Sequence, residues 1–388
     1  MRMLVLGAAG DMGRRAVAEL AKEASVTRLG LAGRNRARLE ALAAACPPGK
    51  AEPVLLDVQD PSSLRSAMAG WDVVASALGP AYLCEVPALR AAIEAGVPYV
   101  SICDDYDAAQ AALALNQAAR DRGLTMVTGL GWTPGLSNLL AKQAAARLDK
   151  PQRIHIAWAG AAGDAQGYAV ILHTLHILTG RVPTFQAGRF RLVQAGSGAE
   201  VLPFPSPLGP VRVAHVGHPE PVTLPRAFPG VDEVTLKGGL AEPFINWLSI
   251  VTTRTGLTRS PRGKAVLGRI FRPLLPFLQR IGPKKIPASG LHVRVEGLLD
   301  GEPARVTVRA VGSMADLTSV PLAVGALLLG QGAVKLPGVH APEAPGLFDA
   351  ERFVQELKAR GLTIEDPVVE RLPAPEPQAP QASRGQGA

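Results

Sequence analysis

Three residues that can exchange protons or orient a substrate follow one another in the chain: Asp104, Asp105 and Tyr106. They stand directly after residues 99–102, a short run that is typical of a buried β-strand. In parallel sheets, ligands bind beyond the carboxyl ends of the strands, so we predict that these three side chains are catalytic. For Asp105 the alternative of a helix cap stays open, because aspartate is a common N-cap residue.

Two histidines form a second candidate group. His173 and His176 lie within residues 169–178, whose pattern predicts a helix, and at this spacing they occupy neighbouring surfaces. One imidazole is expected to face a cleft, and we assign His173 to catalysis and His176 to substrate binding. No metal site is expected, since neither this pair nor His215 with His218 has a nearby cysteine or carboxylate arranged as in a known site.

A third group stands at the start of another expected helix, residues 136–148. Thr133, Gly135 and Asn138 lie at this start, where backbone N–H groups and the helix dipole attract anions. The segment is therefore a candidate for binding a substrate carboxylate. An ordinary helix start, with Pro134 in the first turn, is the competing interpretation.

The sequence GAAGDMG at residues 7–13 follows the first predicted strand and opens a predicted helix. Glycines at this place let the backbone approach a pyrophosphate closely, and the N–H groups at the helix start favour its negative charge. The strand, loop and helix together indicate dinucleotide binding rather than a tight structural turn. The spacing departs from G-x-G-x-x-G in a way that is common among NADP-binding proteins.

The end of the second predicted strand distinguishes NADP from NAD. An NAD enzyme usually carries Asp or Glu there, but this strand ends in Gly33, Arg34 and Asn35. Arg34 offers a planar group of donors to a 2′-phosphate. The sequence therefore predicts NADP as the cofactor, whereas Arg36 and Arg38 fit a solvated helix start.

Two further loops follow the third and fourth predicted strands. Asp57 and Val58 are expected near the adenine, and residues 77–80 near the pyrophosphate and the nicotinamide. The predicted cofactor-binding set is Gly7, Ala9, Gly10, Asp11, Met12, Gly13, Arg34, Asn35, Asp57, Val58, Ala77, Leu78, Gly79 and Pro80.

The elements that must position these residues differ between the two parts of the chain. In the first part, strand-like runs alternate with helical patterns, which is typical of βαβ units. After Gly135 this alternation of strands and helices gives way to one helix and then to several strand-like runs. Further on, Asp300 and Gly301 are suited to a tight hairpin turn. The expected fold is α/β, with an N-terminal Rossmann domain of doubly wound parallel sheet and a second α+β domain whose sheet is largely antiparallel.

We expect four segments along the chain. Residues 1–130 form the Rossmann NADP-binding domain, and residues 131–316 form the α+β substrate and dimerisation domain. Residues 317–366 supply C-terminal helices that return to the Rossmann domain. Residues 367–388 are expected to be disordered, because they are rich in Pro, Gln, Ala and Ser.

The composition is that of an ordinary globular protein. Its 388 residues are 47% hydrophobic, which allows two domains. The net charge of +8 comes from dispersed arginines and only 4% of residues are aromatic, so nucleic-acid binding has no support. The cysteines lack C-x-x-C spacing, and the apolar run at residues 3–6 is too short for the apolar region of a secretory signal, so we expect a cytoplasmic protein. No apolar run reaches the ~20 residues of a transmembrane segment.

One segment combines basic with apolar side chains, residues 262–285, and could contact a membrane surface. Pro273 and Pro276 are expected to interrupt a long helix lying on a membrane. We therefore favour a helix that covers the substrate domain or a subunit interface, and keep membrane-surface contact as the weaker alternative.

Several segments together resemble the saccharopine dehydrogenase-like family. The most specific is TGLGWTPGLSNL at residues 128–139, and AGVPYV at residues 95–100 and GVHAPE at residues 338–343 are also similar. The resemblance covers most of residues 1–365. It implies an NAD(P)-dependent enzyme that interconverts a C=N or C=O bond with the amine or alcohol, and a homodimer. The acidic stretch at residues 104–106 departs from family versions with a single carboxylate, so the substrate is left undefined.

The sequence thus predicts an NADP-dependent oxidoreductase that transfers hydride to or from a C–N or C=O centre of a small, amino-acid-like substrate. One alternative is a catalytically inactive NADP-binding sensor or interaction protein, because the acidic stretch is altered. Another is a lipid-linked enoyl or ketone reductase, because the second domain carries many apolar residues. Hydrolysis has no support, since no G-x-S-x-G motif is present.

Overall fold

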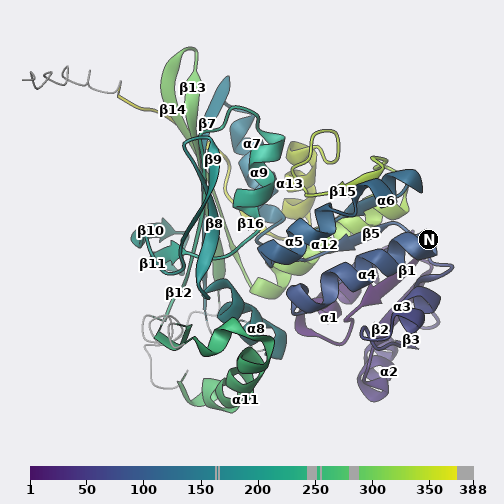
Figure 1. Ribbon diagram of the computed structural model, residues 1–388. Helices are drawn as coiled ribbons and strands as arrows, with labels where there is room; N and C mark the ends of the chain where they lie inside the picture. Colours follow the sequence, from purple (N-terminus) through teal and green to yellow (C-terminus); the bar gives the residue numbers. More distant parts are fainter. Residues whose placement is uncertain (162–163, 165–166, 243–250, 254–255, 279–287, 374–388) are drawn as a thin grey trace, which may run out of the picture.

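The computed structural model describes residues 1–161, 164, 167–242, 251–253, 256–278 and 288–373. These residues form two sheets that stand side by side, with helices packed between them (Figure 1). The first sheet carries the N-terminal domain, and the longer second sheet forms the opposite side of the molecule. The predicted combination of a Rossmann domain with a second α+β domain is confirmed.

The first sheet is parallel, with the strand order β15-β6-β5-β4-β1-β2-β3. Helices cover both of its faces, which is why β1 is buried in four of its five residues. The six strands predicted from the sequence all occur, and β15 adds a seventh that was not predicted. The strands are β1 (Arg2–Leu6), β2 (Arg28–Gly33), β3 (Ala51–Leu55), β4 (Val73–Ser76), β5 (Tyr99–Ser101), β6 (Thr125–Val127) and β15 (Gly338–His340).

The helices of this domain bring one set of loops to a common edge. Strand order reverses between β1 and β4, and loops beyond such a reversal open toward one crevice at the carboxyl ends of the strands. The helices are α1 (Asp11–Leu20), α2 (Arg36–Ala44), α3 (Pro61–Met68), α4 (Ala81–Ala95), α5 (Tyr106–Leu113) and α6 (Asn116–Asp121).

The second sheet has the order β10-β11-β12-β7-β13-β14-β16, and only the β7 and β12 pair among its described pairs is parallel. Asp300 and Gly301 both have positive φ, 54° and 80°, so the predicted hairpin turn is confirmed. The strands are β7 (Lys150–Gly160), β8 (Arg181–Gln186), β9 (Arg189–Gln194), β10 (Glu200–Phe204), β11 (Gly209–His215), β12 (Glu233–Leu240), β13 (Ser289–Leu299), β14 (Glu302–Gly312), β16 (Thr363–Ile364) and β17 (Val368–Arg371).

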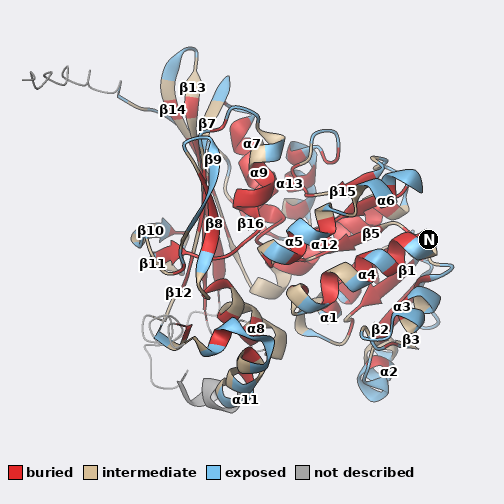
Figure 2. Ribbon diagram, in the orientation of Figure 1, coloured by how far each residue is buried: buried red, intermediate tan, exposed pale blue. Residues whose placement is uncertain are grey.

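One face of the second sheet packs on helices and the other faces outward. Ile154, Ile156 and Trp158 alternate along β7 and belong to the core shared with α7, which follows from the two-residue period of a strand. The burial colours of Figure 2 place the most buried residues along the strands and on the helices between the two sheets. The helices are α7 (Leu136–Ala145), α8 (Tyr168–Ile177), α9 (Glu220–Ala227), α11 (Pro261–Leu278), α12 (Met314–Gly330) and α13 (Ala350–Ala359).

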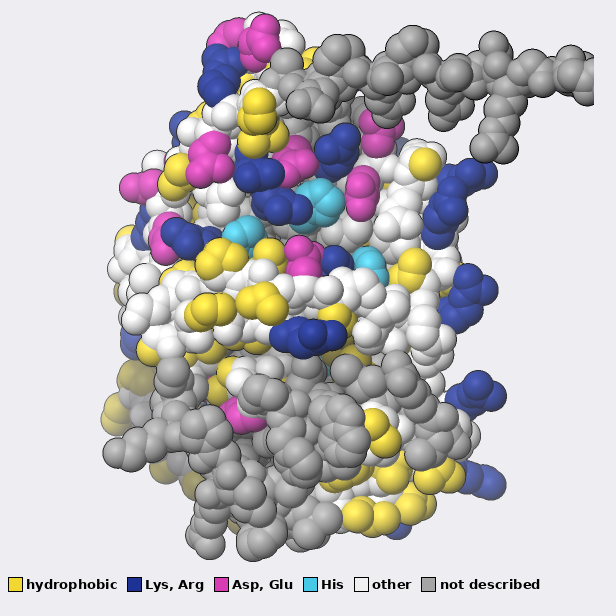
Figure 3. Space-filling view, turned by 90° about the vertical axis from the view of Figure 1, so that its left-hand side faces the viewer, with side chains coloured by type: hydrophobic (Ala, Val, Ile, Leu, Met, Phe, Trp, Pro, Cys, Tyr) yellow, Lys and Arg dark blue, Asp and Glu magenta, His cyan; other side chains and the backbone are white. Residues whose placement is uncertain are grey.

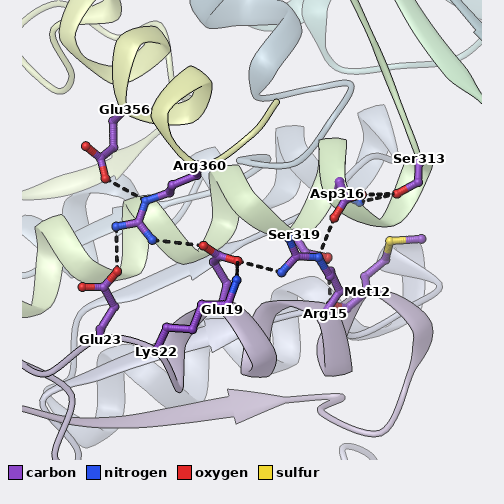
Figure 4. A network of polar contacts seen from close by, with 10 residues as sticks. All are labelled: Met12, Arg15, Glu19, Lys22, Glu23, Ser313, Asp316, Ser319, Glu356 and Arg360. Atoms are coloured by element: carbon purple, nitrogen blue, oxygen red, sulfur yellow. Dashed lines mark hydrogen bonds and ion pairs between the residues drawn. The ribbon is translucent and has the colours of Figure 1, made fainter. Parts of the chain in front are cut away.

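Polar contacts fasten the C-terminal helices to the Rossmann domain (Figure 4). Arg15 of α1 binds Glu19 and, at 2.5 Å, Asp316 of α12. The Ser319 hydroxyl donates to the Met12 carbonyl at 2.8 Å. Because Met12 lies in the first turn of α1, α12 helps to fix the glycine loop that precedes this helix.

Two expectations about chain segments are corrected. Residues 368–371 form β17 and pair with β14, whereas the sequence assigned residues 367–388 to a disordered tail; residues 374–388 lie outside the described part. The sheet partner could not be inferred from composition. Helix α11 continues past Pro273 and Pro276, which were expected to interrupt it, and residues 279–285 of that segment are not among those described. In the part of the chain that the structure describes, no helix is long and apolar enough to cross a membrane.

Candidate active site

The predicted cofactor residues gather at one edge of the first sheet. The glycine loop follows β1, Arg34 and Asn35 follow β2, Asp57 and Val58 lie beyond β3, and residues 77–80 follow β4. These four strands are neighbours and parallel, so their carboxyl ends point the same way. The loops that the sequence assigned to one cofactor are therefore adjacent in space.

The glycine loop fits a pyrophosphate for steric reasons. A Cβ on Gly13 would lie 2.1 Å from the Gly7 carbonyl oxygen, and Gly7 has φ +71°, so both positions require glycine. No side chain caps α1 at Gly10, which leaves the N–H groups of the first turn available to an anion. The Asp11 carboxylate is turned to Arg14 at 2.7 Å.

Arg34 has the surroundings that recognition of a 2′-phosphate requires. It is exposed and forms no ion pair with any described residue, whereas the neighbouring Arg36 is paired with Glu40. Burial raises the pKa of the Cys84 thiol in α4 to about 11, and the charge of Arg34 acts on that thiol in the opposite direction. Arg34 is therefore close to the start of α4. Asn35 instead caps α2, since its side chain accepts from the Arg38 N–H.

Helix α8 of the second domain closes over the cofactor loops. A Cβ on Gly79 would lie 3.0 Å from the Ala169 side chain, and one on Gly167 would lie 3.3 Å from the Asp11 carboxylate. Four residues after Ala169, on the same side of α8, stands His173. The first turns of α8 thus carry His173 to the ends of β4 and β5.

His173 meets the two predicted aspartates there. Its Nδ1 lies 2.9 Å from an Asp105 oxygen and 3.4 Å from an Asp104 oxygen. Burial lowers the pKa of His173, but the charges of Asp104 and Asp105 outweigh it and raise this pKa to about 9. Burial, together with the charge of Asp105, raises the pKa of Asp104 to about 7 against the effect of His173. The contacts with Asp104 and Asp105 therefore favour the imidazolium form of His173.

Asp105 occupies the N-cap position of α5, but its side chain does not cap that helix. Instead, one oxygen accepts from the Tyr82 N–H at 2.8 Å, in the first turn of α4, and the other accepts from His173. The carboxylate thereby joins α4, α5 and α8. Of the two alternatives for Asp105, the helix cap is therefore wrong, and the carboxylate belongs to the group around His173.

His176 lies one turn further along α8 and is held on both ring nitrogens. Its Nε2 contacts Asp107 at 3.2 Å, its Nδ1 contacts Lys264 of α11, and its ring stacks on Tyr82 at 4.5 Å. The Tyr106 ring is 6.4 Å from it. These contacts fasten α11 to α8, and they leave His176 less free to bind a substrate than its sequence position suggested.

Thr133, Gly135 and Asn138 lie in a buried polar network at the start of α7. The Thr133 hydroxyl donates to Glu220 at 2.6 Å. Asn138 accepts from the Gly135 N–H and donates to Glu343 at 2.8 Å. Asn138 is fully buried, so the polar groups at this helix start are occupied by the protein itself. Their predicted role with a substrate carboxylate stays a prediction.

Asp104, Asp105 and His173 also offer one ligand atom each, all within 4.8 Å of one another, as a divalent cation would need. In this structure His173 Nδ1 makes a hydrogen bond to Asp105 at 2.9 Å, so a cation could bind here only by displacing the proton of that bond.

Sequence reasoning missed two residues beside this group. The His218 ring meets the His173 ring edge-on, with 5.2 Å between centroids, and Glu220 lies 3.9 Å from His218 Nδ1. His218 was considered only as half of a metal pair with His215. The sequence His-Pro-Glu at residues 218–220 was the available signal, but it does not reveal that Glu220 is completely buried.

Comparison with known proteins bears on the N-terminal domain and on the fold. Residues 3–127 match the family described as saccharopine dehydrogenase NADP binding domain. Apo saccharopine dehydrogenase (L-Glu forming) from Saccharomyces cerevisiae has the same fold, with a TM-score of 0.68 at 18% identity over 96% of this chain and 100% of that one. A meso-dapdh mutant from Clostridium tetani E88 aligns over 92% of this chain and 99% of that one at 14% identity, with a TM-score of 0.45.

The family match covers the domain whose loops the geometry assigns to the cofactor. NADP is thereby confirmed as the cofactor, and the predicted family resemblance is confirmed for this domain. The predicted homodimer, cytoplasmic location and membrane-surface contact stay predictions. Residues 3–127 match the NADP-binding domain of saccharopine dehydrogenase, and the chain is an NADP-dependent oxidoreductase with the fold of that enzyme.

Proposed function

We propose that the chain transfers hydride to or from a C–N or C=O centre of a small, amino-acid-like substrate, with His173 as the residue that exchanges the proton. The observation that carries the proposal is the position of His173. It stands four residues after Ala169, which contacts the cofactor loop at Gly79, and it is held by Asp104 and Asp105. An acid beside the hydride-carrying ring is what reduction of a polar double bond requires.

Each residue has a separate task in this proposal. Asp105 fixes the imidazole through Nδ1, which leaves Nε2 as the nitrogen that exchanges a proton with the substrate. Asp104 helps to keep the ring charged. Bound NADPH would supply the hydride, and NADP⁺ would accept it in the reverse direction. Closure of α8 over the glycine loop would exclude water from the reacting atoms.

The first test concerns the cofactor site, because it requires no knowledge of the substrate. NADPH and NADH are titrated by fluorescence into the wild type and into Arg34→Ala. We expect the wild type to prefer NADPH, and the variant to bind NADPH about 10- to 100-fold more weakly with NADH unchanged, as for loss of a charged hydrogen bond to phosphate. Equal binding of both cofactors by the wild type would contradict the assignment of Arg34.

Arg38→Ala is the matched control, since Arg38 is exposed at the start of α2 close to Arg34 in the sequence. Its affinity for NADPH should stay within about twofold of the wild type, because a solvated charge contributes little. Hydride exchange is then followed with a panel of amines and keto acids. Tight NADPH binding without any turnover would favour the inactive sensor over the enzyme.

A further inference from the structure

Helix α11 packs on α8 through one of its sides, at the end of the second domain (Figure 1). The Lys264 amine contacts the His176 ring of α8. The Tyr168 hydroxyl, also of α8, donates to the Ala265 carbonyl at 3.2 Å. A Cβ on Gly268 would lie 3.0 Å from the Tyr168 ring, so the two helices are in close contact there. Lys264 and Gly268 are buried and lie one turn apart, which defines the packed side of α11.

The opposite side of α11 exposes apolar and basic side chains together. Val266 and Ile270 lie one turn apart and are 55% and 51% exposed. Arg262 and Arg269 are also exposed, and neither forms an ion pair with any residue that the structure describes. Because a helix turns by about 100° per residue, all four side chains point away from Lys264. We call these four residues the α11 patch.

The chain around the α11 patch carries positive charge without acidic residues. Between Glu242 and Glu296 the sequence contains no Asp or Glu. Leu257, in the short helix η1 (Leu257–Arg259) that precedes α11, is exposed as well, at 58%. A solvated helix face usually carries charges of both signs, whereas apolar side chains among basic ones are typical of a helix that lies on an anionic membrane surface.

The sequence offered one argument against such a surface, and the structure removes it. Pro273 and Pro276 were expected to interrupt the helix, but α11 extends over 18 residues from Pro261 to Leu278. The α11 patch therefore belongs to a continuous helix, and the other side of this helix is held by α8.

We propose that the α11 patch docks on an anionic lipid surface. Val266 and Ile270 would enter the boundary between headgroups and acyl chains, and Arg262 and Arg269 would bind the lipid phosphates. A second copy of the same face fits less well, because it would bring arginines opposite arginines and this segment has no carboxylate to pair with them. The inference does not depend on the proposed hydride transfer.

The test measures binding of the full chain to vesicles that are collected by sedimentation. One set of vesicles is made of phosphatidylcholine alone, and the other also contains phosphatidylglycerol, which is anionic. We expect the protein to bind the anionic vesicles more strongly by about 10-fold or more. Added salt should release it from them, since salt screens the attraction between exposed charges.

Two double variants separate the two parts of the α11 patch. Arg262→Gln with Arg269→Gln should weaken binding to anionic vesicles by about 30-fold, or about fivefold for each charge removed near the surface. Val266→Ser with Ile270→Ser should weaken it by about 10- to 100-fold, because less apolar area is buried in the lipid. Since all four side chains are exposed, the thermal midpoint of both variants should stay near that of the wild type.

The matched controls change exposed residues elsewhere in the molecule. Arg65→Gln with Arg90→Gln removes two exposed charges from α3 and α4. Val201→Ser with Val368→Ser changes two valines of β10 and β17, which are 61% and 51% exposed. Both controls should bind anionic vesicles like the wild type.

Several results would overturn the inference. No binding to vesicles, or equal binding to both kinds, would exclude an anionic lipid surface as the partner. Unchanged binding by either patch variant, or an equal loss in the controls, would place the contact elsewhere. The molar mass in solution is measured in parallel by light scattering. If the wild type is a dimer and the patch variants are monomers, the α11 patch is instead an interface between copies of this chain.

Discussion

The second domain carries histidines on both sides of its sheet, and the two sides differ in chemistry. On the inner side, facing the Rossmann domain, His173 has its pKa raised to about 9. On the outer side, His155 and His292 line a shallow pocket, and both have a pKa lowered to about 4. Figure 3 shows this outer face, where histidines gather with lysines, arginines and acidic side chains.

Burial does not explain the difference, because it lowers the pKa of all three histidines. The neighbouring charges decide the sign. His173 faces two carboxylates from the loop after β5, whereas the charge of Arg294 lowers the pKa of both His155 and His292 further. The pKa of a buried histidine is therefore raised where carboxylates lie next to it and lowered where cations do.

The largest effect expected from this comparison is on turnover. His173→Gln removes the group that exchanges the proton and should lower kcat by about 10²- to 10⁴-fold while leaving NADPH affinity unchanged. Steady-state kinetics with a substrate found in the panel of amines and keto acids measure this change. His292→Gln is the matched control from the outer face and should keep wild-type turnover; equal losses in both variants would show that the two sides do not differ in function.

The second prediction concerns the pH dependence of the inner side. Reduction needs His173 protonated, so its rate should be flat below the pKa of about 9 and fall as the pH rises through it. Asp105→Asn removes a negative charge that raises this pKa, so the fall should move to lower pH by about 1–2 units. The pH profile of kcat measures the shift.

Because Asp105 also accepts from the Tyr82 N–H, the thermal midpoint of Asp105→Asn is measured in parallel. Asp107→Asn is the control, since its carboxylate contacts His176 rather than His173. A pH profile that is the same in Asp105→Asn and the wild type would argue against His173 as the proton donor.

The smallest effect is expected on the outer side. Arg294→Gln removes a positive charge that lowers the pKa of His155 and His292, so both should rise by about one unit with turnover unchanged. Their titration is followed by NMR. Since a lowered pKa makes the folded state lose stability as the pH falls from about 6.5 to about 4, the variant should lose less stability than the wild type over that range. A change in the kcat profile would contradict the separation of the two sides.

Much of the Rossmann domain could be predicted because its signals are local. Gly7 has φ +71°, a conformation that favours glycine, so this requirement can be recognised from a single position of the sequence. Buried parallel strands can likewise be recognised as continuous apolar runs. The preference for NADP could also be predicted from two adjacent positions, because Arg34 and Asn35 stand where an NAD enzyme usually carries a carboxylate. The hairpin at Asp300 and Gly301 follows the same rule, since both residues need positive φ.

Contacts between distant segments were not predictable in the same way. β15 joins β6 across more than two hundred residues, and β17 pairs with β14 although its surroundings in sequence are those of a tail. His218 reaches His173 because the segment between β11 and α9 lies beside the end of α8, where the Gly217 N–H donates to the Ile177 carbonyl at 2.9 Å. No local sequence pattern identifies these partners, because each contact joins segments that are not neighbours in the chain.

The sequence by itself determined the cofactor: the spacing of Gly7, Gly10 and Gly13 and the side chain of Arg34 are recognised within single loops. Tertiary structure decided the chemistry, because a pKa depends on the charges that surround a group rather than on its neighbours in the chain. The pKa of His173 is raised because Asp104 and Asp105 lie against it, and burial raises the pKa of Glu220 to about 7 although the hydroxyls of Thr133 and Ser137 donate to it.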